Sequence, residues 1–293
     1  DSMNELLARL PSGWEPDALV FWQPHLYAMP NGWEKSEVPI FGIIGPWQLL
    51  GLLDCDLDWL RTFEGIFVDT AGVEYFTRQG FENVWSFLSC SFDPAIHYPD
   101  PKLDKIYDIS FAGALVHPIH RQRTSWLYRV AKMADRYKIG FFDWVLTPDQ
   151  YAQLLRQSRI IFNFSYRGEL NIRSFEAMAS GALLFVEEKN LDIKDHFEDG
   201  IHYVSYNRSN YQERLEYYLT NDEERERIAE NGRRQVQLHT NGSHISWLTD
   251  KLRSVLKKPR RSFSQPWTPR HKGINHFVVD VNEFAIGMHW WNV

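Results

Sequence analysis

Short apolar runs separated by turn residues recur along the first part of the chain. The four runs are 18–22 (ALVFW), 40–44 (IFGII), 65–68 (GIFV) and 84–88 (VWSFL). Continuous apolar runs of this length are typical of strands in a parallel sheet that is covered on both faces. Two segments between them, 49–63 and 71–79, carry helical patterns. Strands that alternate with helices predict βαβ units and an α/β fold.

The alternation continues after the Pro-rich stretch HYPDPK at 97–102. In this second part the predicted strands are 106–112, 138–142, 160–164, 183–186 and 202–206. The predicted helices are 121–137, 148–157 and 172–180, followed by three polar-faced helices at 211–219, 222–239 and 244–256. Helix breakers at Asn221, Asn241 and Pro259 separate or end the last three.

These patterns predict a domain over 1–100, a second domain over 101–258 and a tail over 259–293. The tail starts basic and ends in the aromatic segment FVVDVNEFAIGMHWW. We expect its apolar residues to pack back on the N-terminal domain as a strand or loop. An edge that faces a partner is the alternative.

The composition narrows the class of protein. Apolar residues make up 44% and aromatic residues 15% of the 293, enough for a large core and an aromatic-lined cleft. The net charge of −6 argues against nucleic acid as a partner, because phosphate binding needs a broad positive surface. The sequence shows neither a signal peptide pattern nor an apolar stretch of the roughly 18 residues that a membrane helix needs. Two cysteines, Cys55 and Cys90, are typical of a reducing, cytoplasmic setting.

The strongest local signal is YRGELNIRSFEAMASGALLF at 166–185. A predicted strand ends before it, and a helix opens after Asn171, a residue type that favours the N-cap position. The N–H groups at a helix start bind anions with help from the helix dipole. Arg173 in the first turn adds a full positive charge and a fork of donors. This pattern predicts a site for a diphosphate.

The helix after Asn171 has two distinct faces. Positions 173, 176 and 180 share one face, whereas the apolar positions 172, 175 and 179 share another that we expect in the core. The Glu176 carboxylate, one turn beyond the phosphate site, can accept two hydrogen bonds from a ribose diol. An isolated Arg-x-x-Glu is more often a surface pair of little energetic worth. Here Gly181 and the apolar strand behind it place the helix start at the carboxyl edge of an α/β sheet, where ligands bind.

The segment LNIRSFEAMASGALLF at 170–185 resembles the C-terminal nucleotide-sugar motif of GT-B glycosyltransferases. It is most similar to the CgeB-like (spore maturation protein CgeB) branch of the glycosyl transferases group 1 superfamily. YDISFAGALVHPIHRQR at 107–123 resembles the first strand and phosphate-facing loop of that domain, and ERERIAENGRRQVQLHTNGSHISWL at 224–248 resembles its closing helices. GIFVDTAGVEYFTRQGFENVWSFLSCSFDPAIHYP at 65–99 is similar to the last strand–helix–strand unit before the linker. The resemblance implies a GT-B fold, with two Rossmann-like parallel-sheet domains facing a cleft and the N-terminal one short or incomplete.

The resemblance also implies that the second domain holds a UDP- or GDP-linked sugar. Glu176 would bind the ribose, and Asn171 to Arg173 the diphosphate. The implied donor-binding residues are Gly113, Arg121, Arg123, Gly168, Glu169, Leu170, Asn171, Ile172, Arg173 and Glu176. The implied nucleobase-side residues are Asp143, Trp144 and Val145. The alternatives are solvated surface positions for Arg121 and Arg123 and ordinary packing for Trp144.

The chain departs from the family pattern in three respects. The usual two Glu lie eight positions apart, whereas Glu169 and Glu176 lie seven apart and Gly168 takes the expected slot. The common Arg-and-Lys pair after the first strand is missing, since no Lys occurs between Lys105 and Lys132. The first domain is short for an acceptor domain, so that either an N-terminal portion lies outside this chain or the tail completes the fold.

Sugar transfer requires stabilisation of the departing diphosphate, for which GT-B sites usually use helix dipoles and Arg rather than a metal. We therefore expect Arg173 in that role, with no metal and no cofactor. An inverting enzyme also needs a general base for the acceptor hydroxyl. His25 after the first strand and Asp69 after the third are candidates, with a structural role as the alternative for each. His97 near the linker is a further candidate.

The acceptor is left open among a saccharide, a protein and a small molecule. Three other functions are also compatible with parts of the pattern. The short first domain and the displaced Glu favour a GT-B-shaped nucleotide-sugar-binding protein or an inactive subunit. A GT-B epimerase or phosphorylase is the second. A dinucleotide oxidoreductase is the third, but no G-x-G-x-x-G follows any predicted strand.

Overall fold

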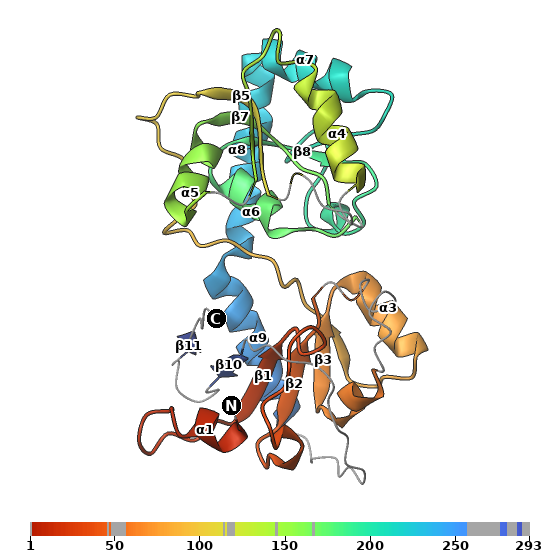
Figure 1. Ribbon diagram of the computed structural model, residues 1–293, viewed down its shortest axis with the longest axis vertical. Helices are drawn as coiled ribbons and strands as arrows, with labels where there is room; N and C mark the ends of the chain where they lie inside the picture. Colours follow the sequence, from red (N-terminus) through yellow and green to blue (C-terminus); the bar gives the residue numbers. More distant parts are fainter. Residues whose placement is uncertain are drawn as a thin grey trace. The chain divides into compact units, whose positions relative to one another are not determined.

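The chain folds as two compact units, one formed by 1–89 with 244–293 and the other by 90–243. The computed structural model describes residues 2–45, 47, 57–113, 115, 121–143, 146–165, 168–256, 276–279 and 286–288 (Figure 1). The second unit is a single stretch of sequence, whereas the first is assembled from both ends of the chain.

The first unit is built on one mixed sheet. Four parallel strands follow each other in order: β1 (Ala18–Trp22), β2 (Ile40–Ile43), β3 (Gly65–Val68) and β4 (Val84–Ser86). Their residues are largely buried, and these four strands confirm the strands predicted from the apolar runs. Two strands of the tail extend the sheet beyond β1: β10 (His276–Val279) pairs antiparallel with β1, and β11 (Ile286–Met288) pairs antiparallel with β10.

Helices of 3 to 16 residues pack on this sheet. They are α1 (Met3–Leu7), η1 (Trp33–Lys35), η3 (Asp58–Thr62), α3 (Thr70–Arg78) and α9 (Asn241–Leu256). On one face, Leu248 and Leu252 of α9 pack in a cluster with Phe41 and Phe67 of the sheet. Of the helix predicted at 49–63, residues 49–56 lie outside the described residues, and the described part contains the 3-10 helix η3.

The second unit contains a fully parallel sheet of five strands. They are β5 (Tyr107–Ala112), β6 (Ile139–Phe142), β7 (Ser158–Phe162), β8 (Leu183–Glu187) and β9 (Val204–Tyr206). Their spatial order is β6-β5-β7-β8-β9, so the chain leaves β5 toward one side and later returns on its other side. The carboxyl ends of β5 and β7 therefore form a topological switch point, the place where open α/β sheets bind ligands.

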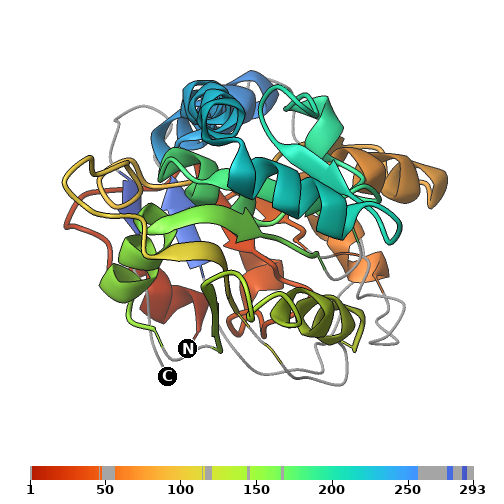
Figure 2. The ribbon, with the colours of Figure 1, turned by 90° about the horizontal axis from the view of Figure 1, so that it is seen from above.

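Helices lie on both faces of this second sheet (Figure 2). They are α4 (Arg121–Ala131), α5 (Pro148–Arg156), α6 (Ile172–Ala179), η5 (Ile193–Asp195), α7 (Tyr211–Thr220), α8 (Asp222–Val236) and η6 (Gln237–His239). Residues of α4 and α7 join the strands in one large apolar cluster, while α5 packs on α6 and α6 on α8. The helix predicted at 121–137 ends at Ala131, because the amides of Met133, Ala134 and Arg136 bond to carbonyls three residues back instead of four.

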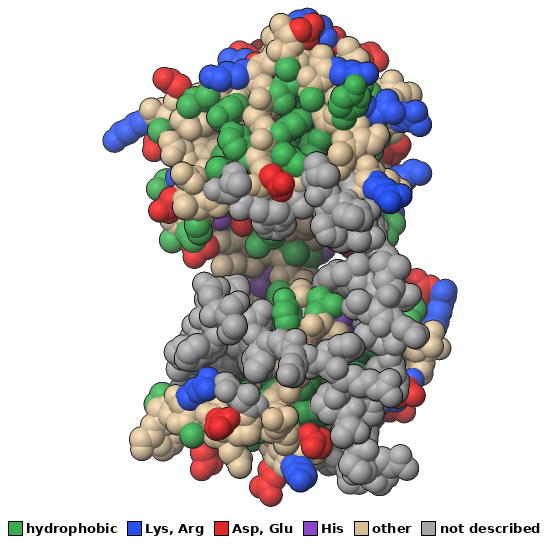
Figure 3. Space-filling model, in the orientation of Figure 1, with side chains coloured by type: hydrophobic (Ala, Val, Ile, Leu, Met, Phe, Trp, Pro, Cys, Tyr) green, Lys and Arg blue, Asp and Glu red, His purple; other side chains and the backbone are tan. Residues whose placement is uncertain are grey.

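The α/β prediction, with parallel-sheet regions in both units, is thus confirmed. On the face of the second unit seen in Figure 3, apolar side chains gather in the middle and charged side chains of both signs lie around them. Within the described ranges, no helix has the length and apolar character to cross a bilayer.

Candidate functional site

Arg173 connects the two strand ends at the switch point of the second unit. It lies in the first turn of α6, whose position behind β7 the sequence predicted. Its Nε donates to the carbonyl oxygen of Ala112, the last residue of β5, at 2.9 Å. Its Nη1 donates to Oδ1 of Asn163, which directly follows β7, at 2.7 Å. The guanidinium group is therefore fixed at the edge where a ligand of this fold binds.

A second arginine and an aromatic ring complete this part of the site. The guanidinium carbons of Arg173 and Arg123 lie 4.3 and 5.6 Å from the ring centroid of Phe111. Arg123 is buried and donates from Nε to the carbonyl of Phe164 at 3.2 Å. Burial and, second, the positive charge of Arg173 lower the pKa of Arg123 to about 10, while the carboxylates of Glu169 and Glu187 act in the opposite direction. Both arginines remain charged at neutral pH, which favours an anionic ligand.

Among the described residues, no side chain caps the start of α6, so its first backbone N–H groups can bind a ligand. Asn171 occupies the predicted N-cap position with extended backbone angles, but its side chain makes no capping hydrogen bond. Instead its Nδ2 donates to Oδ1 of Asn163 at 3.2 Å and to Oγ of Ser165 at 3.5 Å. A helix start without a side-chain cap leaves donors for an anion, and the helix dipole adds to the attraction.

Glu176 lies one turn further along α6 and is almost fully buried. Its Oε2 accepts from the hydroxyl of Tyr151 at 2.7 Å, and its Oε1 lies 3.3 Å from Nε2 of His97. Burial and, second, the charge of Glu176 raise the pKa of Tyr151 well above its usual value. Arg173 and Glu176 share one partner, because the Tyr151 hydroxyl interacts with both side chains. Their other contacts are with Ala112, Asn163 and His97, so the two side chains do not form the simple surface pair that the sequence allowed.

The loop before α6 is fastened to the loop after β8. Gly168 has a φ of +81°, and a β carbon there would lie 2.7 Å from the carbonyl oxygen of Lys189. The carbonyl of Gly168 accepts from the amide of Leu191 at 2.7 Å. Nδ2 of Asn190 donates to the carbonyl of Glu169 at 2.9 Å and to Oγ of Ser165 at 3.0 Å. These bonds fix the path of the loop that leads into the anion-binding helix start.

Glu187 at the carboxyl end of β8 is a buried acid that sequence reasoning missed. Its Oε1 accepts from the amide of Ser165 at 3.0 Å, while Oε2 is buried with no partner among the described residues. Burial raises the pKa of Glu187 to about 7, with the charge of Glu169 acting in the same direction. An acidic residue directly after a buried strand was the signal that could have identified it.

The other predicted donor residues are distributed around this edge. Leu170 is buried, whereas Arg121 is exposed at the first position of α4. Asp143 accepts from the amide of Leu115 at 3.2 Å and so joins the segments after β5 and β6. Trp144 and Val145 lie outside the described residues.

The predicted apolar face of α6 needs one correction. Phe175 and Ala179 are buried as expected, but Ile172 is 52% exposed. Ile172 is the first residue of the helix, so the positions three and four residues before it belong to a loop rather than to a helical turn. The periodicity that defines a helical face does not apply to such a residue.

His25 and Asp69 follow strands β1 and β3 of the first unit. Asp69 is the N-cap of α3, where Oδ1 accepts from the amide of Gly72 at 2.6 Å, and both its oxygens accept from Nε1 of Trp47 at 2.8 and 2.9 Å. His25 is buried, and neither of its ring nitrogens has a partner among the described residues. Burial lowers the pKa of His25 to about 4, so that the imidazole is neutral at pH 7.

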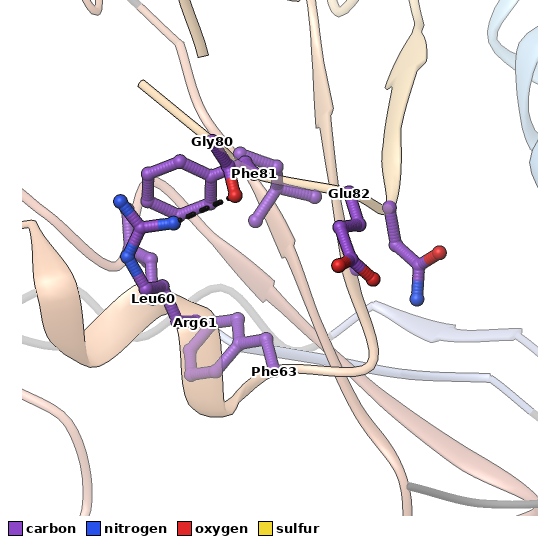
Figure 4. Close-up of a pocket in the computed structure, with 9 residues that line it drawn as sticks. Leu60, Arg61, Phe63, Gly80, Phe81 and Glu82 are labelled. Carbon is purple, nitrogen blue, oxygen red and sulfur yellow. Dashed lines mark hydrogen bonds between the residues drawn. The ribbon is translucent and has the colours of Figure 1, made fainter. Parts of the chain in front are cut away.

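A pocket in the first unit lies at the other end of the sheet, where β3 and β4 begin (Figure 4). The guanidinium carbon of Arg61 lies 4.1 Å from the ring centroid of Phe81, and its Nη1 donates to the carbonyl of Gly80 at 2.9 Å. None of the sequence-predicted site residues lines this pocket. Among the described residues, no group of three or more His, Cys, Asp or Glu side chains is arranged to hold a metal ion.

Residues 114–246, which contain Arg123, Arg173 and Glu176 of this site, match the family described as glycosyl transferase-like. No curated protein sequence matches the chain.

Solved structures share the fold at low sequence identity. Sucrose-phosphate synthase from Thermosynechococcus elongatus is 12% identical, with a TM-score of 0.57 over 76% of this chain and 69% of that one. HepE from Anabaena, solved with UDP-glucose, is 10% identical, with a TM-score of 0.54 over 74% of this chain and 72% of that one. A TarM variant from S. aureus, solved with UDP among its ligands, is 14% identical, with a TM-score of 0.56 over 75% of this chain and 51% of that one. These structures support the GT-B fold predicted for the chain.

Proposed function

We propose that this protein is a GT-B glycosyltransferase that moves a sugar from a nucleotide-diphosphate sugar to an acceptor. The observation that carries the proposal is the position of Arg173, which is bonded to the ends of β5 and β7 beside an uncapped helix start. Cationic and backbone donors that are already fixed in place stabilise charge without reorganising during the reaction. The match of residues 114–246 to the glycosyl transferase-like family and the fold of the neighbours support the same conclusion.

The donor diphosphate is proposed to lie at the start of α6. The backbone N–H groups there, the guanidinium group of Arg173 and the nearby charge of Arg123 all favour a dianion. During transfer, negative charge grows on the phosphate that leaves the sugar, and the same groups stabilise it. The site therefore needs no metal ion in our proposal. UDP and GDP are the nucleotides to consider, and the segment after β6 that begins with Asp143 is proposed to lie on the base side.

Glu176 is proposed to bind the ribose. It lies one helical turn, about 5.4 Å along the axis, beyond the phosphate site, so it can contact the part of the nucleotide next to the diphosphate. Its carboxylate is held between Tyr151 and His97 and remains an acceptor on both oxygens.

His25 is the better of the two candidates for a base in the first unit. Both carboxylate oxygens of Asp69 already accept hydrogen bonds from Trp47, and one also caps α3. The ring nitrogens of His25 have no partner among the described residues. A neutral imidazole can accept the proton of an acceptor hydroxyl.

The proposal also includes a branch of the superfamily and a cellular location for the protein. The motif at 170–185 supports the CgeB-like branch of the superfamily, and the two cysteines support a cytoplasmic setting. The acceptor, whether saccharide, protein or small molecule, is left to experiment.

The test is calorimetric titration with UDP, GDP and their glucose conjugates, followed by an assay for sugar transfer to a panel of saccharide, peptide and small-molecule acceptors. We expect one nucleotide diphosphate to bind and its sugar conjugate to be consumed. Binding without hydrolysis or transfer over hours would select a nucleotide-sugar-binding protein instead. Absence of binding to every nucleotide diphosphate would refute the proposal.

A further inference from the structure

The geometry points to Tyr151 and His97 as positioning residues that orient the Glu176 carboxylate toward a ribose diol, so that the site selects ribonucleotides over 2′-deoxyribonucleotides. This inference rests on the proposed function, because it assumes that a nucleotide binds at α6. It assigns a role to two residues that do not themselves contact the nucleotide.

The two side chains reach Glu176 from different parts of the second unit. Tyr151 lies on α5, and its hydroxyl donates to Oε2 at 2.7 Å. His97 lies in the segment before β5, and its Nε2 is 3.3 Å from Oε1. The two carboxylate oxygens therefore face two different side chains, the Tyr151 hydroxyl donor at Oε2 and the His97 imidazole at Oε1. The His97 and Tyr151 rings meet edge to face, with centroids 6.1 Å apart, so each ring also limits the movement of the other.

His97 is held in place by the same helix that carries Tyr151. Arg156 of α5 donates from Nε to the carbonyl of Tyr98 at 2.9 Å and from Nη2 to the carbonyl of Ile96. Both neighbours of His97 are thus bonded to one guanidinium group. The amide of His97 donates to the carbonyl of Asp93 at 2.8 Å, which closes a turn. One helix, α5, consequently fixes both donors relative to each other.

A glutamate needs such help to act as a precise acceptor. The last torsion of its side chain is broad, so an unsupported carboxylate rotates among many orientations. The Tyr151 donor at one oxygen and the His97 contact at the other select one of them. A carboxylate offers about four lone-pair directions, and these two side chains face two of them. One direction on each oxygen is left, which matches the two hydroxyl groups of a ribose but only one hydroxyl of a 2′-deoxyribose.

Burial strengthens the effect of these two side chains on the orientation of the carboxylate. Glu176 is 9% exposed, His97 is buried and Tyr151 is half-buried. In such surroundings water does not replace a lost donor, so removal of the Tyr151 hydroxyl leaves the carboxylate to rotate and to find other partners. The Tyr151 hydroxyl also interacts with Arg173, but the bonds of Arg173 to Ala112 and Asn163 do not depend on it. We therefore expect the larger loss at the contact with the 2′-hydroxyl.

The experiment compares UDP with 2′-deoxy-UDP, and GDP with 2′-deoxy-GDP, by calorimetry on the full chain and on Tyr151→Phe. We expect the unchanged protein to prefer the ribonucleotide, and Tyr151→Phe to weaken ribonucleotide binding about tenfold, the size of one hydrogen bond to a charged group. Binding of the deoxy form should change by less than about twofold. Tyr218→Phe is the matched control, because it removes another buried phenol hydroxyl of the same unit.

A second pair of variants tests His97. His97→Leu removes the polar contact to Oε1 and should reduce the preference for ribonucleotides, as Tyr151→Phe does. His97→Gln provides an N–H group and should keep most of this preference. This pair decides the question if Tyr151→Phe does not fold.

The outcomes separate this inference from the proposed function. Two results would overturn the positioning role and still be compatible with the nucleotide site. One is an equal loss of affinity for the ribo and deoxy nucleotides in the variants. The other is equal affinity of the wild-type protein for both forms. An unchanged protein that binds none of the four nucleotides would overturn the proposed function, and this inference with it.

Discussion

Gly113 leaves the space that the guanidinium group of Arg173 occupies. A β carbon on Gly113 would lie 2.5 Å from Nη2 of Arg173, and the φ of Gly113 is +139°. Position 113 therefore combines a backbone conformation that favours glycine with close contact to the tip of the Arg173 side chain.

Gly113→Ala should displace Arg173 and weaken binding of UDP or GDP. Loss of a charge-assisted hydrogen bond costs about 1.5–3 kcal/mol, which corresponds to a loss of affinity of about tenfold or more. Gly200→Ala is the matched control, because Gly200 also has a positive φ but a β carbon there meets nothing within 4 Å. Equal affinity for the two variants, measured by calorimetry, would speak against the role of this close approach.

Arg173→Ala should weaken binding of nucleoside diphosphates much more than binding of nucleosides. The reason is that the guanidinium group faces the diphosphate in our proposal, and the expected loss for UDP or GDP is about tenfold to a hundredfold. Arg136→Ala removes another positive charge from the same unit, on an exposed side chain that bonds to Glu216, and should change neither ligand. If Arg173→Ala reduced binding of uridine and UDP by the same factor, the phosphate role would be lost.

Glu187→Gln should alter the dependence of stability on pH. The pKa of Glu187 is raised to about 7 in the folded protein, from 4.5 in the unfolded chain, so the folded state binds the proton more tightly. The free energy of unfolding therefore contains a contribution of up to about 3 kcal/mol below pH 4.5, which is lost as the pH rises to about 7. Urea unfolding at pH 5 and pH 8 measures it. The difference between the urea midpoints at the two pH values should differ between Glu187→Gln and the wild-type protein. The same difference in both proteins would contradict a raised pKa for Glu187.

His25→Gln should change the pH dependence in the opposite direction. Burial lowers the pKa of His25 to about 4 from 6.5, so the unfolded chain binds the proton more tightly. The unchanged protein then loses stability as the pH falls from 6.5 to 4, whereas the variant, which carries no titrating group there, loses less. Urea unfolding at pH 7 and pH 5 provides the comparison. A larger loss of stability between pH 7 and pH 5 in the variant than in the wild-type protein would contradict a buried neutral imidazole.

Sugar transfer should survive treatment with EDTA. Our proposal assigns the charge on the leaving phosphate to Arg173 and to the start of α6. The sequence does contain alternating aspartates, DCDLD at 54–58, a pattern that suits a divalent cation, and 54–56 lie outside the described residues. Loss of all activity in EDTA with recovery on addition of manganese would therefore show that a metal takes part.

Sequence patterns were sufficient for the elements and for part of the site. Continuous apolar runs located β1 and β3 to the residue, because strands covered on both faces tolerate few polar side chains. The N-cap position of Asn171 and the placement of Arg173 in the first turn are local properties and were predicted. Whether these residues bind a ligand remains a prediction.

The partners of the site residues could not be predicted, since they depend on tertiary packing. Tyr151 meets Glu176 across 25 positions, and Arg173 meets Ala112 across 61. No periodicity within one helix encodes such pairs. The same holds for Glu187, whose raised pKa arises from burial at the end of a strand. Ile172 shows that a local pattern can also mislead. The helical periodicity predicted a core position for it, but it lies at the helix start and is exposed.

The two units differ in how their sequence is arranged, and this has a consequence for folding during synthesis. The second unit, 90–243, is contiguous, so all its strands have been made before α9 is complete. The first unit needs α9 and β10 from the far end of the chain to cover β1 and its neighbours. An emerging chain therefore carries the incomplete sheet of its first unit, with the apolar edge of β1 open, until α9 and β10 have been made. Termination before that point would release a protein whose second unit can fold while β1 is exposed to aggregation.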